Sequence, residues 1–268
     1  MCYINGVRVS LQEFITYKQI QKELKEVGAA IANRPAHKGF DYGDWPVIKP
    51  SLDGKDWDVV AMEWGFIPSY LNTAQDVYNF RHGYTDASGR FRPPLTTLNA
   101  MGEELLKPGK MFRDAALHRR CLILSSGFYE HRHIFPIGKK GLPLKTAVKY
   151  PYHITVKDTP VFMMAGIYQP WTDKETGETK DSFAIITTDA NPLMKQIHNS
   201  KNRMPTLLSD QLADEWSNPD LTEERITQLA TNQFPVEKMK AHTVAKDFLA
   251  NVDPTEEFIY PDLPDLVY

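Results

Sequence analysis

The chain has 268 residues, of which 42% are apolar and 24% charged, a composition typical of folded globular proteins and unlike that of disordered ones. The net charge of -3 argues against a protein that coats nucleic acid through bulk positive charge. Any nucleic-acid contact must therefore be local, and the candidate basic clusters lie at residues 118–120, 139–140 and 195–203.

Neither a membrane-spanning apolar stretch nor an export signal is evident, so we expect a cytoplasmic protein. Only two cysteines are present, Cys2 and Cys121. A disulfide framework or a thiolate zinc site is therefore not indicated, and we expect no metal ion and no organic cofactor.

In chain order, helical spacing of apolar residues first predicts an amphipathic helix over residues 11–31. Short strands are predicted at residues 57–60 and 62–67, where β-branched and aromatic runs are broken by Pro and Gly. The polar, Gly- and Pro-rich residues 79–94 predict an exposed loop.

The middle of the chain is rich in short apolar runs bounded by turn residues. These runs predict strands at residues 120–124, 152–156, 161–168 and 183–187, which together indicate a closed or strongly curved sheet. Helices are predicted at residues 192–197, 209–216 and 222–229, the last with Thr222 as N-cap. The fold class expected is α+β, with a mostly antiparallel, barrel-like sheet flanked by helices in one domain.

Cys2 is the first candidate for chemistry. Removal of Met1 would leave an α-amine and a thiol on adjacent carbons, and such a 1,2-aminothiol converts an aldehyde first to an imine and then to a five-membered thiazolidine. Both groups titrate near neutrality, so modest tuning makes each nucleophilic. The structural alternative is a small buried thiol near the terminus.

Glu130 and His198 are candidate proton-transfer groups. Glu130 follows the aromatic run Gly127-Phe128-Tyr129, and burial there would raise its pKa and suit it to acid–base work. His198 lies in a polar, basic stretch, where its near-neutral pKa suits the same role. The alternatives are a strand-end Glu paired with an Arg and a surface His.

Further polar and aromatic residues could bind a nucleotide. The Asn99 amide can donate to a sugar hydroxyl or accept from an amine, or it can cap a turn. Trp64, in the run that ends at Pro68, could stack on an unpaired base or could belong to the core. Lys201 and Arg203 could hold a phosphate or remain solvated.

Together and in this order, these motifs resemble the SRAP family, the SOS-response-associated abasic-site processing proteins. The matching elements are Met1-Cys2, Trp64-Gly65-Phe66-Ile67-Pro68, Asn99-Ala100 with Glu103, Phe112-Arg113, Arg119-Arg120-Cys121-Leu122, Gly127-Phe128-Tyr129-Glu130, Pro151-Tyr152, Ala165-Gly166, Ile197-His198 and Arg203-Met204-Pro205. Each motif is weak alone, but the ordered set is specific. It spans residues 1–208, and we expect a domain of residues 1–230 with residues 231–268 as an extension packed on it.

The resemblance implies a covalent crosslink to abasic sites in single-stranded DNA. It implies that Cys2 is the nucleophile, that Asn99 positions the amine or sugar, that Glu130 shuttles protons and that His198 assists ring opening and reversal. It also implies autopeptidase removal of Met1, a lyase-like activity and a monomer with a positively charged DNA groove. The residues then expected to contact DNA are Trp64, Pro68, Arg113, Arg119, Arg120, Arg203 and Met204.

The chain departs from the family pattern at three places. Tyr3-Ile4 stands where the family usually has Gly-Arg, Met101 stands where it has Arg, and His131 stands where it has Trp. Two phosphate-binding arginines are therefore missing, and other arginines would have to compensate. Two alternative functions follow: a peptidase or amidase with Cys2 as N-terminal nucleophile, and a non-catalytic module that binds single strands.

Overall fold

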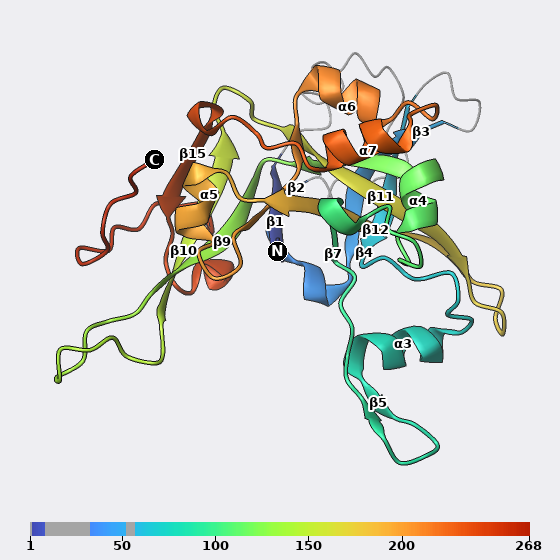
Figure 1. The fold of residues 1–268 in the computed structure, drawn as a ribbon, viewed down its shortest axis with the longest axis horizontal. Coiled ribbons are helices and arrows are strands. Elements are labelled where there is room, and N and C mark those ends of the chain that lie inside the picture. The colour runs from blue at the N-terminus through green and yellow to red at the C-terminus, as the bar shows by residue number, and fades with distance from the viewer. Residues whose placement is uncertain (1, 9–32, 52–56) are drawn as a thin grey trace.

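A closed barrel forms the centre of the computed structural model, which describes residues 2–8, 33–51 and 57–268 (Figure 1). The helix predicted over residues 11–31 lies outside these described residues. The barrel strands follow the order β12-β4-β3-β8-β11, and pairing of β11 with β12 closes the ring. Neighbouring barrel strands are antiparallel except for the parallel pair β12 and β4. Their bounds are β3 (Asp44–Pro50), β4 (Trp57–Trp64), β8 (Arg120–Ser125), β11 (Phe162–Thr172) and β12 (Thr179–Asp189).

A second, antiparallel sheet stands beside the barrel, with the order β15-β10-β9-β1-β2. Its strands are β1 (Ile4–Arg8), β2 (Asn33–Lys38), β9 (Gly127–Ile134), β10 (Val148–Val156) and β15 (Met239–Thr243). The chain passes from the barrel into this sheet at Ser126, between β8 and β9. Gly127 is required there, because a Cβ atom would lie 2.0 Å from His153 Nε2. The crossing brings β9, and with it Glu130, next to β1.

Helices and short strands complete the fold. The helices are α3 (Ala74–His82), α4 (Arg113–His118), α5 (Pro192–Ile197), α6 (Asp210–Trp216) and α7 (Glu223–Ala230), with 3-10 turns η1 (Gly39–Asp41), η2 (Gly102–Glu104), η3 (Val236–Lys238) and η4 (Phe248–Ala250). The short strands are β5 (Tyr84–Thr85), β6 (Phe91–Arg92), β7 (Asn99–Met101), β13 (Arg203–Pro205) and β14 (Leu207–Leu208). Among the described residues, none of the helices has the length and apolar character needed to cross a membrane.

The predicted α+β class with a barrel-like sheet is confirmed. The four central strands appear as β8, β10, β11 and β12, and the two strands predicted within residues 57–67 form the single strand β4. The three predicted helices are α5, α6 and α7, and the Thr222 side chain accepts from Arg225 N, as an N-cap does. All six residues of β8 are buried, as expected for a strand covered on both faces.

The loop predicted over residues 79–94 is wrong at its start. α3 runs through Asn79 to His82, and a reciprocal capping box between Thr73 and Asp76 stabilises its first turn. Val77 is the buried hydrophobic residue of this helix. The apolar periodicity that reveals a helix in sequence is therefore almost absent, while the capping residues carry the signal.

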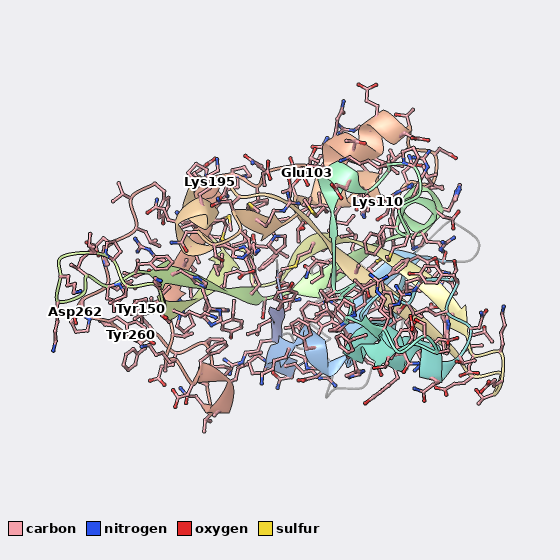
Figure 2. The ribbon with its side chains drawn as sticks, turned by 60° about the horizontal axis from the view of Figure 1, so that its bottom comes forward. Glu103, Lys110, Tyr150, Lys195, Tyr260 and Asp262 are labelled. Carbon is pink, nitrogen blue, oxygen red and sulfur yellow. The ribbon has the colours of Figure 1, made fainter. Side chains whose placement is uncertain are left out.

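The C-terminal residues lie against the second sheet. β15 is an edge strand of that sheet, paired with β10. Beyond it, the ring of Tyr260 packs edge-on against Tyr150 of β10 at 5.0 Å, with Asp262 close by in the view of Figure 2. The proposed division at residue 230 stays a prediction.

Candidate functional site

Cys2 lies two residues before the start of β1 and has no exposed surface. Its thiol Sγ lies 3.7 Å from the backbone oxygen of Ile4. Burial, and then the nearby Glu130 carboxylate, raise the pKa of the thiol far above its ordinary value. Cys2 is therefore a neutral thiol, and a base must remove the thiol proton before the sulfur can attack.

Asn99 reaches Cys2 from the barrel side. It begins β7, which pairs in parallel with β12, and its Nδ2 donates to the backbone oxygen of Cys2 over 2.9 Å. Asn99 Oδ1 is buried and has no hydrogen-bond partner among the described residues. The amide therefore holds the backbone at Cys2 and keeps an acceptor available within the site.

Glu130 lies on β9, beside β1, and is almost fully buried. Burial raises the pKa of its carboxyl to about 8, because a low-dielectric environment disfavours the charged form. At pH 7 most molecules therefore hold a protonated Glu130, which can donate a proton.

His198 faces Glu130 from the end of α5. Its Nε2 lies 3.7 Å from Glu130 Oε2, and its Nδ1 lies 2.7 Å from the backbone oxygen of Arg203. A carbonyl can only accept, so Nδ1 carries the hydrogen and Nε2 of the neutral ring faces the carboxyl as an acceptor. Burial lowers the pKa of His198 to about 4. At neutral pH the pair is therefore a neutral acid facing a neutral base.

Four elements distant in sequence thus converge at one place. Cys2, Asn99, Glu130 and His198 come from the segment before β1, from β7, from β9 and from the end of α5. In Figure 1 the start of the chain lies between β9 and β7. All four residues predicted as catalytic lie in this neighbourhood. Among the described residues, no three His, Cys, Asp or Glu side chains gather closely enough to hold a metal ion.

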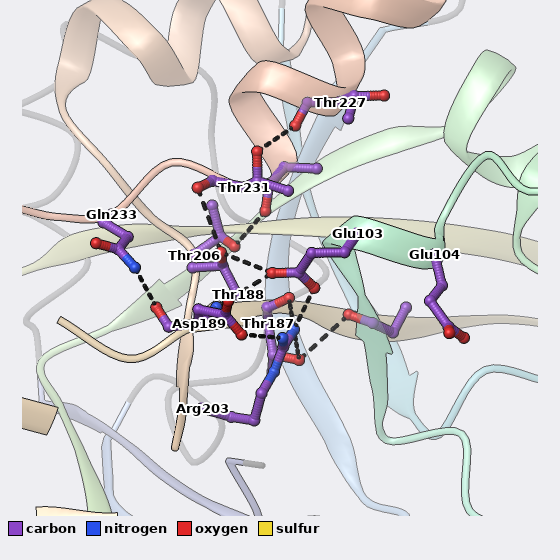
Figure 3. A network of polar contacts seen from close by, with 12 residues as sticks. Glu103, Glu104, Thr187, Thr188, Asp189, Arg203, Thr206, Thr227, Thr231 and Gln233 are labelled. Atoms are coloured by element: carbon purple, nitrogen blue, oxygen red, sulfur yellow. Dashed lines mark hydrogen bonds and ion pairs between the residues drawn. The ribbon is translucent and has the colours of Figure 1, made fainter. Parts of the chain in front are cut away.

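Arg203 is built into a network of ion pairs instead of facing outward (Figure 3). Its guanidinium contacts Glu103 Oε2 at 2.7 Å and Asp189 Oδ1 at 3.0 Å, and it donates to the backbone oxygen of Thr187. It is 8% exposed, and its contact with DNA stays a prediction. The sequence did not reveal that Arg203 also acts through its backbone. The carbonyl oxygen of Arg203 fixes the tautomer of His198.

Four more of the predicted DNA contacts are also structural. Trp64 is fully buried and donates from Nε1 to the Leu98 oxygen, so its ring is part of the core in this structure. Met204 has no exposed surface, and Pro68 is buried. Arg120 is buried and donates to carbonyls around α4 and α6, including those of Ala116 and Trp216. In this structure the four side chains serve the fold, and their contact with DNA stays a prediction.

Arg113 and Arg119 remain partly exposed. Arg113 pairs with Glu223 at 2.6 Å, and Arg119 pairs with Asp114 at 2.5 Å and also donates to Gln169. Both lie at the ends of α4, which packs against β11, β8 and α7. Their contact with DNA stays a prediction, and it would require exchange of a carboxylate for a phosphate.

Comparisons with known proteins place the fold and the site in a family. The family model described as SOS response associated peptidase (SRAP) matches residues 8–250. The abasic site processing protein YoqW of Bacillus subtilis (strain 168) is 30% identical over 194 residues, 72% of each chain. The abasic site processing protein HMCES of Xenopus tropicalis is 24% identical over 236 residues, covering 79% of this chain and 62% of the relative.

A solved structure supports the same relationship. The crystal structure of a protein from Bacteroides thetaiotaomicron superposes with a TM-score of 0.77 at 31% identity, covering 95% of this chain and 97% of the other. A family match over nearly the whole chain, a shared barrel and an ordered set of site motifs agree with one another. The chain belongs to the SOS response associated peptidase (SRAP) family.

Proposed function

We propose that this protein processes abasic sites in single-stranded DNA by forming a covalent thiazolidine crosslink through Cys2 after Met1 has been removed. The observation that carries the proposal is the convergence of Cys2, Asn99, Glu130 and His198 from four separate elements. Membership of the family, and relatives named abasic site processing proteins, support it.

The chemistry balances without a cofactor. The α-amine of Cys2 adds to C1′ of the open-chain abasic aldehyde to give a hemiaminal, which loses water to become an imine. The Cys2 thiol then adds to the imine carbon, its proton passes to the imine nitrogen, and the five-membered ring closes. One water molecule leaves in all, and the protein stays bound through C–N and C–S bonds.

The protonation states of the site fit these steps. A neutral Glu130 can protonate the departing hydroxyl of the hemiaminal or the sugar ring oxygen during opening. Neutral His198 offers Nε2 as an acceptor that can take a proton from the reacting groups. The hydrogen bond from Nδ1 to the Arg203 carbonyl leaves Nε2 without a hydrogen. Asn99 holds the Cys2 backbone and offers Oδ1 to the amine.

The substrate must expose its sugar to reach this site. Cys2 has no exposed surface, so the lesion has to leave the base stack, which costs least where no opposite strand pairs with it. One chain supplies all four groups, so the proposal assigns the reaction to a monomer. The proposed function also places the protein in the compartment that holds DNA, which is the cytoplasm in a cell without a nucleus.

Intact mass measurement before and after incubation with an abasic oligonucleotide tests the proposal. We expect loss of one methionine from the protein and then an adduct equal to protein plus oligonucleotide minus one water. A tetrahydrofuran analogue of the lesion, which has no aldehyde, serves as the matched control substrate. Processed protein that forms no adduct contradicts the proposal.

The variant Cys2→Ala separates the proposed chemistry from its alternatives. It keeps a terminal amine but cannot close the ring, so the heat-stable adduct is expected to disappear while binding to the tetrahydrofuran oligonucleotide persists. A heat-stable adduct of undiminished yield would reject Cys2 as the nucleophile. Hydrolysis of a peptide amide by the processed protein, in the absence of DNA, would support an N-terminal-nucleophile hydrolase instead.

A further inference from the structure

The connection from β9 to β10 combines a strong positive charge with an absence of carboxylates. Residues 131–157 contain no Asp or Glu, in a chain whose net charge is -3. The cations of this stretch are Arg132, Lys139, Lys140, Lys145, Lys149 and Lys157. We call residues 131–150 the basic arm. Figure 1 shows that it extends away from the body of the molecule.

The two sides of the arm are hydrogen-bonded to each other at its base and near its tip. Paired strands run from His131, opposite Pro151, to Ile134, opposite Val148. The pairing continues outward through the hydrogen bonds Leu144 N to Pro136 O and Gly138 N to Leu142 O, each 2.8 Å long.

The tip of the arm is a turn closed by a 2.9 Å hydrogen bond from Gly141 N to Gly138 O. Gly141 has a positive φ of 71°, which a residue with a side chain rarely adopts. Lys139 and Lys140 occupy the two central positions of this turn, and both are exposed. The fold therefore presents two ammonium groups at the far end of a built support.

Exposed apolar side chains accompany these lysines. Phe135 is 51% exposed, Ile137 66%, Leu142 68% and Leu144 49%. Apolar faces beside cations suit a partner that is anionic along its length and carries flat apolar groups, which describes unpaired nucleotides.

The arm is continuous with the candidate site. It begins at the residue after Glu130, and Arg132 lies on the same face of β9 as Glu130 because side chains alternate along a strand. The nine steps along the chain from Glu130 to Lys139 span roughly 30 Å when extended. A strand bound at Cys2 could therefore contact the arm along several nucleotides.

The base of the arm already holds an acidic, extended segment. Residues 251–268 carry five carboxylate side chains, Asp253, Glu256, Glu257, Asp262 and Asp265, and no Lys or Arg. The Arg132 guanidinium donates to the backbone oxygen of Pro264 in this segment. The C-terminal segment therefore contacts the base of the arm through a backbone carbonyl.

We propose that the basic arm is a DNA-binding element that holds the single strand flanking the lesion, with its lysines on phosphates and its exposed apolar side chains against unstacked bases. This inference rests on the proposed function and adds the surface that replaces the arginines missing at Tyr3-Ile4 and Met101. Phosphate contacts supply most of the sequence-independent affinity of such proteins and make it depend on salt.

Fluorescence anisotropy with a labelled single-stranded oligonucleotide that carries a tetrahydrofuran lesion tests the arm. The triple variant Lys139→Glu/Lys140→Glu/Lys145→Glu is expected to raise the dissociation constant by at least about tenfold at moderate salt. The slope of log K against log salt should become shallower by about 2, since single strands lose roughly 0.7 per phosphate contact. A second variant, Phe135→Ala, should weaken binding about fivefold without changing that slope.

The matched control is Lys107→Glu/Lys110→Glu/Lys174→Glu, which makes the same charge change at exposed positions outside the arm; in Figure 2, Lys110 lies far across the view from Tyr150. Equal effects of the two triple variants on affinity and salt slope would overturn the proposal. The proposal would also be overturned if the arm variant bound DNA as the wild type does but lost binding to phosphatidylserine vesicles. That result would make the arm a membrane contact.

Crosslinking distinguishes failure of the arm from failure of the proposed function. With the arm variant, the maximal crosslinking rate at saturating DNA should stay unchanged while the half-saturating concentration rises. A wild-type protein that binds through the arm but forms no crosslink would reject the chemistry and leave the arm in place. If the arm variant and the wild-type protein crosslink at the same rate at every DNA concentration, the proposed role of the arm is rejected and the proposed function is not.

Discussion

Glu130 and Arg203 are both buried ionisable residues beside His198, but the structure treats their charges in opposite ways. The Arg203 guanidinium is surrounded by Glu103, Asp189 and the backbone carbonyl oxygen of Thr187 (Figure 3). Glu130 has a neutral His198 nearby, and burial raises its pKa to about 8. A saturated ion pair is typical of structural support, whereas a buried acid that is neutral at pH 7 is able to transfer protons.

The largest effect expected from this comparison is on the rate of crosslinking. Glu130→Gln keeps the shape of the side chain but removes its proton, and we expect the maximal crosslinking rate to fall about 10²–10⁴-fold. Binding of the tetrahydrofuran oligonucleotide should change little, because the loss concerns a proton transfer. Single-turnover crosslinking and anisotropy measure the two quantities, and equal losses in both would assign Glu130 to binding.

Disrupting the ion-pair network of Arg203 should lower the stability of the fold. Arg203→Met leaves Glu103 partly buried beside an apolar side chain, and we expect the free energy of unfolding to fall by about 3–5 kcal/mol. Arg203→Lys, which keeps the charge but cannot contact Glu103 and Asp189 through two separate nitrogens, should lose less. Urea denaturation followed by fluorescence measures both, and a stable Arg203→Met protein would show that the network is dispensable.

The pH dependence of the rate tests the state of Glu130 directly. The rate also depends on the Cys2 α-amine, which must be neutral to attack and titrates near pH 8, so the wild-type protein is compared with Glu130→Gln at each pH. Ionisation of Glu130, whose pKa is about 8, should lower the ratio of the wild-type rate to the Glu130→Gln rate about tenfold between pH 7 and 9. A ratio that stays constant over this range would show that Glu130 is not the proton donor.

The same pKa shift has a consequence for stability, with a defined sign. Glu130 binds its proton more tightly in the folded chain than in the unfolded chain, where its pKa is near 4.5. The protonated carboxyl therefore favours folding at low pH, and this contribution declines as the pH rises from about 4.5 to about 8. His198, whose pKa is lowered, acts in the opposite direction and favours folding above pH 6.5.

The smallest effect should come from the outer member of the Arg203 network. The Asp189 side chain is 71% exposed, so solvent screens its ion pair with Arg203. Asp189→Asn should lower the free energy of unfolding by less than about 1 kcal/mol. Urea denaturation of Asp189→Asn and Arg203→Met side by side gives the ratio of the two losses, and equal losses would show that Asp189 carries more of the network than its exposure suggests.

Local features of the sequence predicted most of the regular structure. Apolar runs marked β8 and β12, and N-cap residues such as Thr222 marked where a helix starts. α3 was missed because its signal lies in a capping box and not in apolar periodicity. Short-range patterns therefore predict an element only where burial or capping leaves a periodic or positional trace.

The structure places the predicted catalytic residues and the predicted DNA-contacting residues in different surroundings. Cys2, Asn99, Glu130 and His198 were predicted from their ordered motifs, and they lie together. Arginines and aromatic residues suit both a core and a DNA surface, and residue type alone does not separate the two. Trp64, Arg120 and Arg203 proved to be internal, because backbone carbonyls and carboxylates already occupy their donors.

The sequence by itself determined the family motifs, the fold class, the aminothiol that Met1 removal would create and the carboxylate-free stretch of residues 131–157. Only the tertiary structure decided which cations face solvent and which are neutralised inside. It also decided that β9 and the end of α5 bring Glu130 within 3.7 Å of His198. The reason is that burial and charge state depend on neighbours brought together across the chain, which no local pattern specifies.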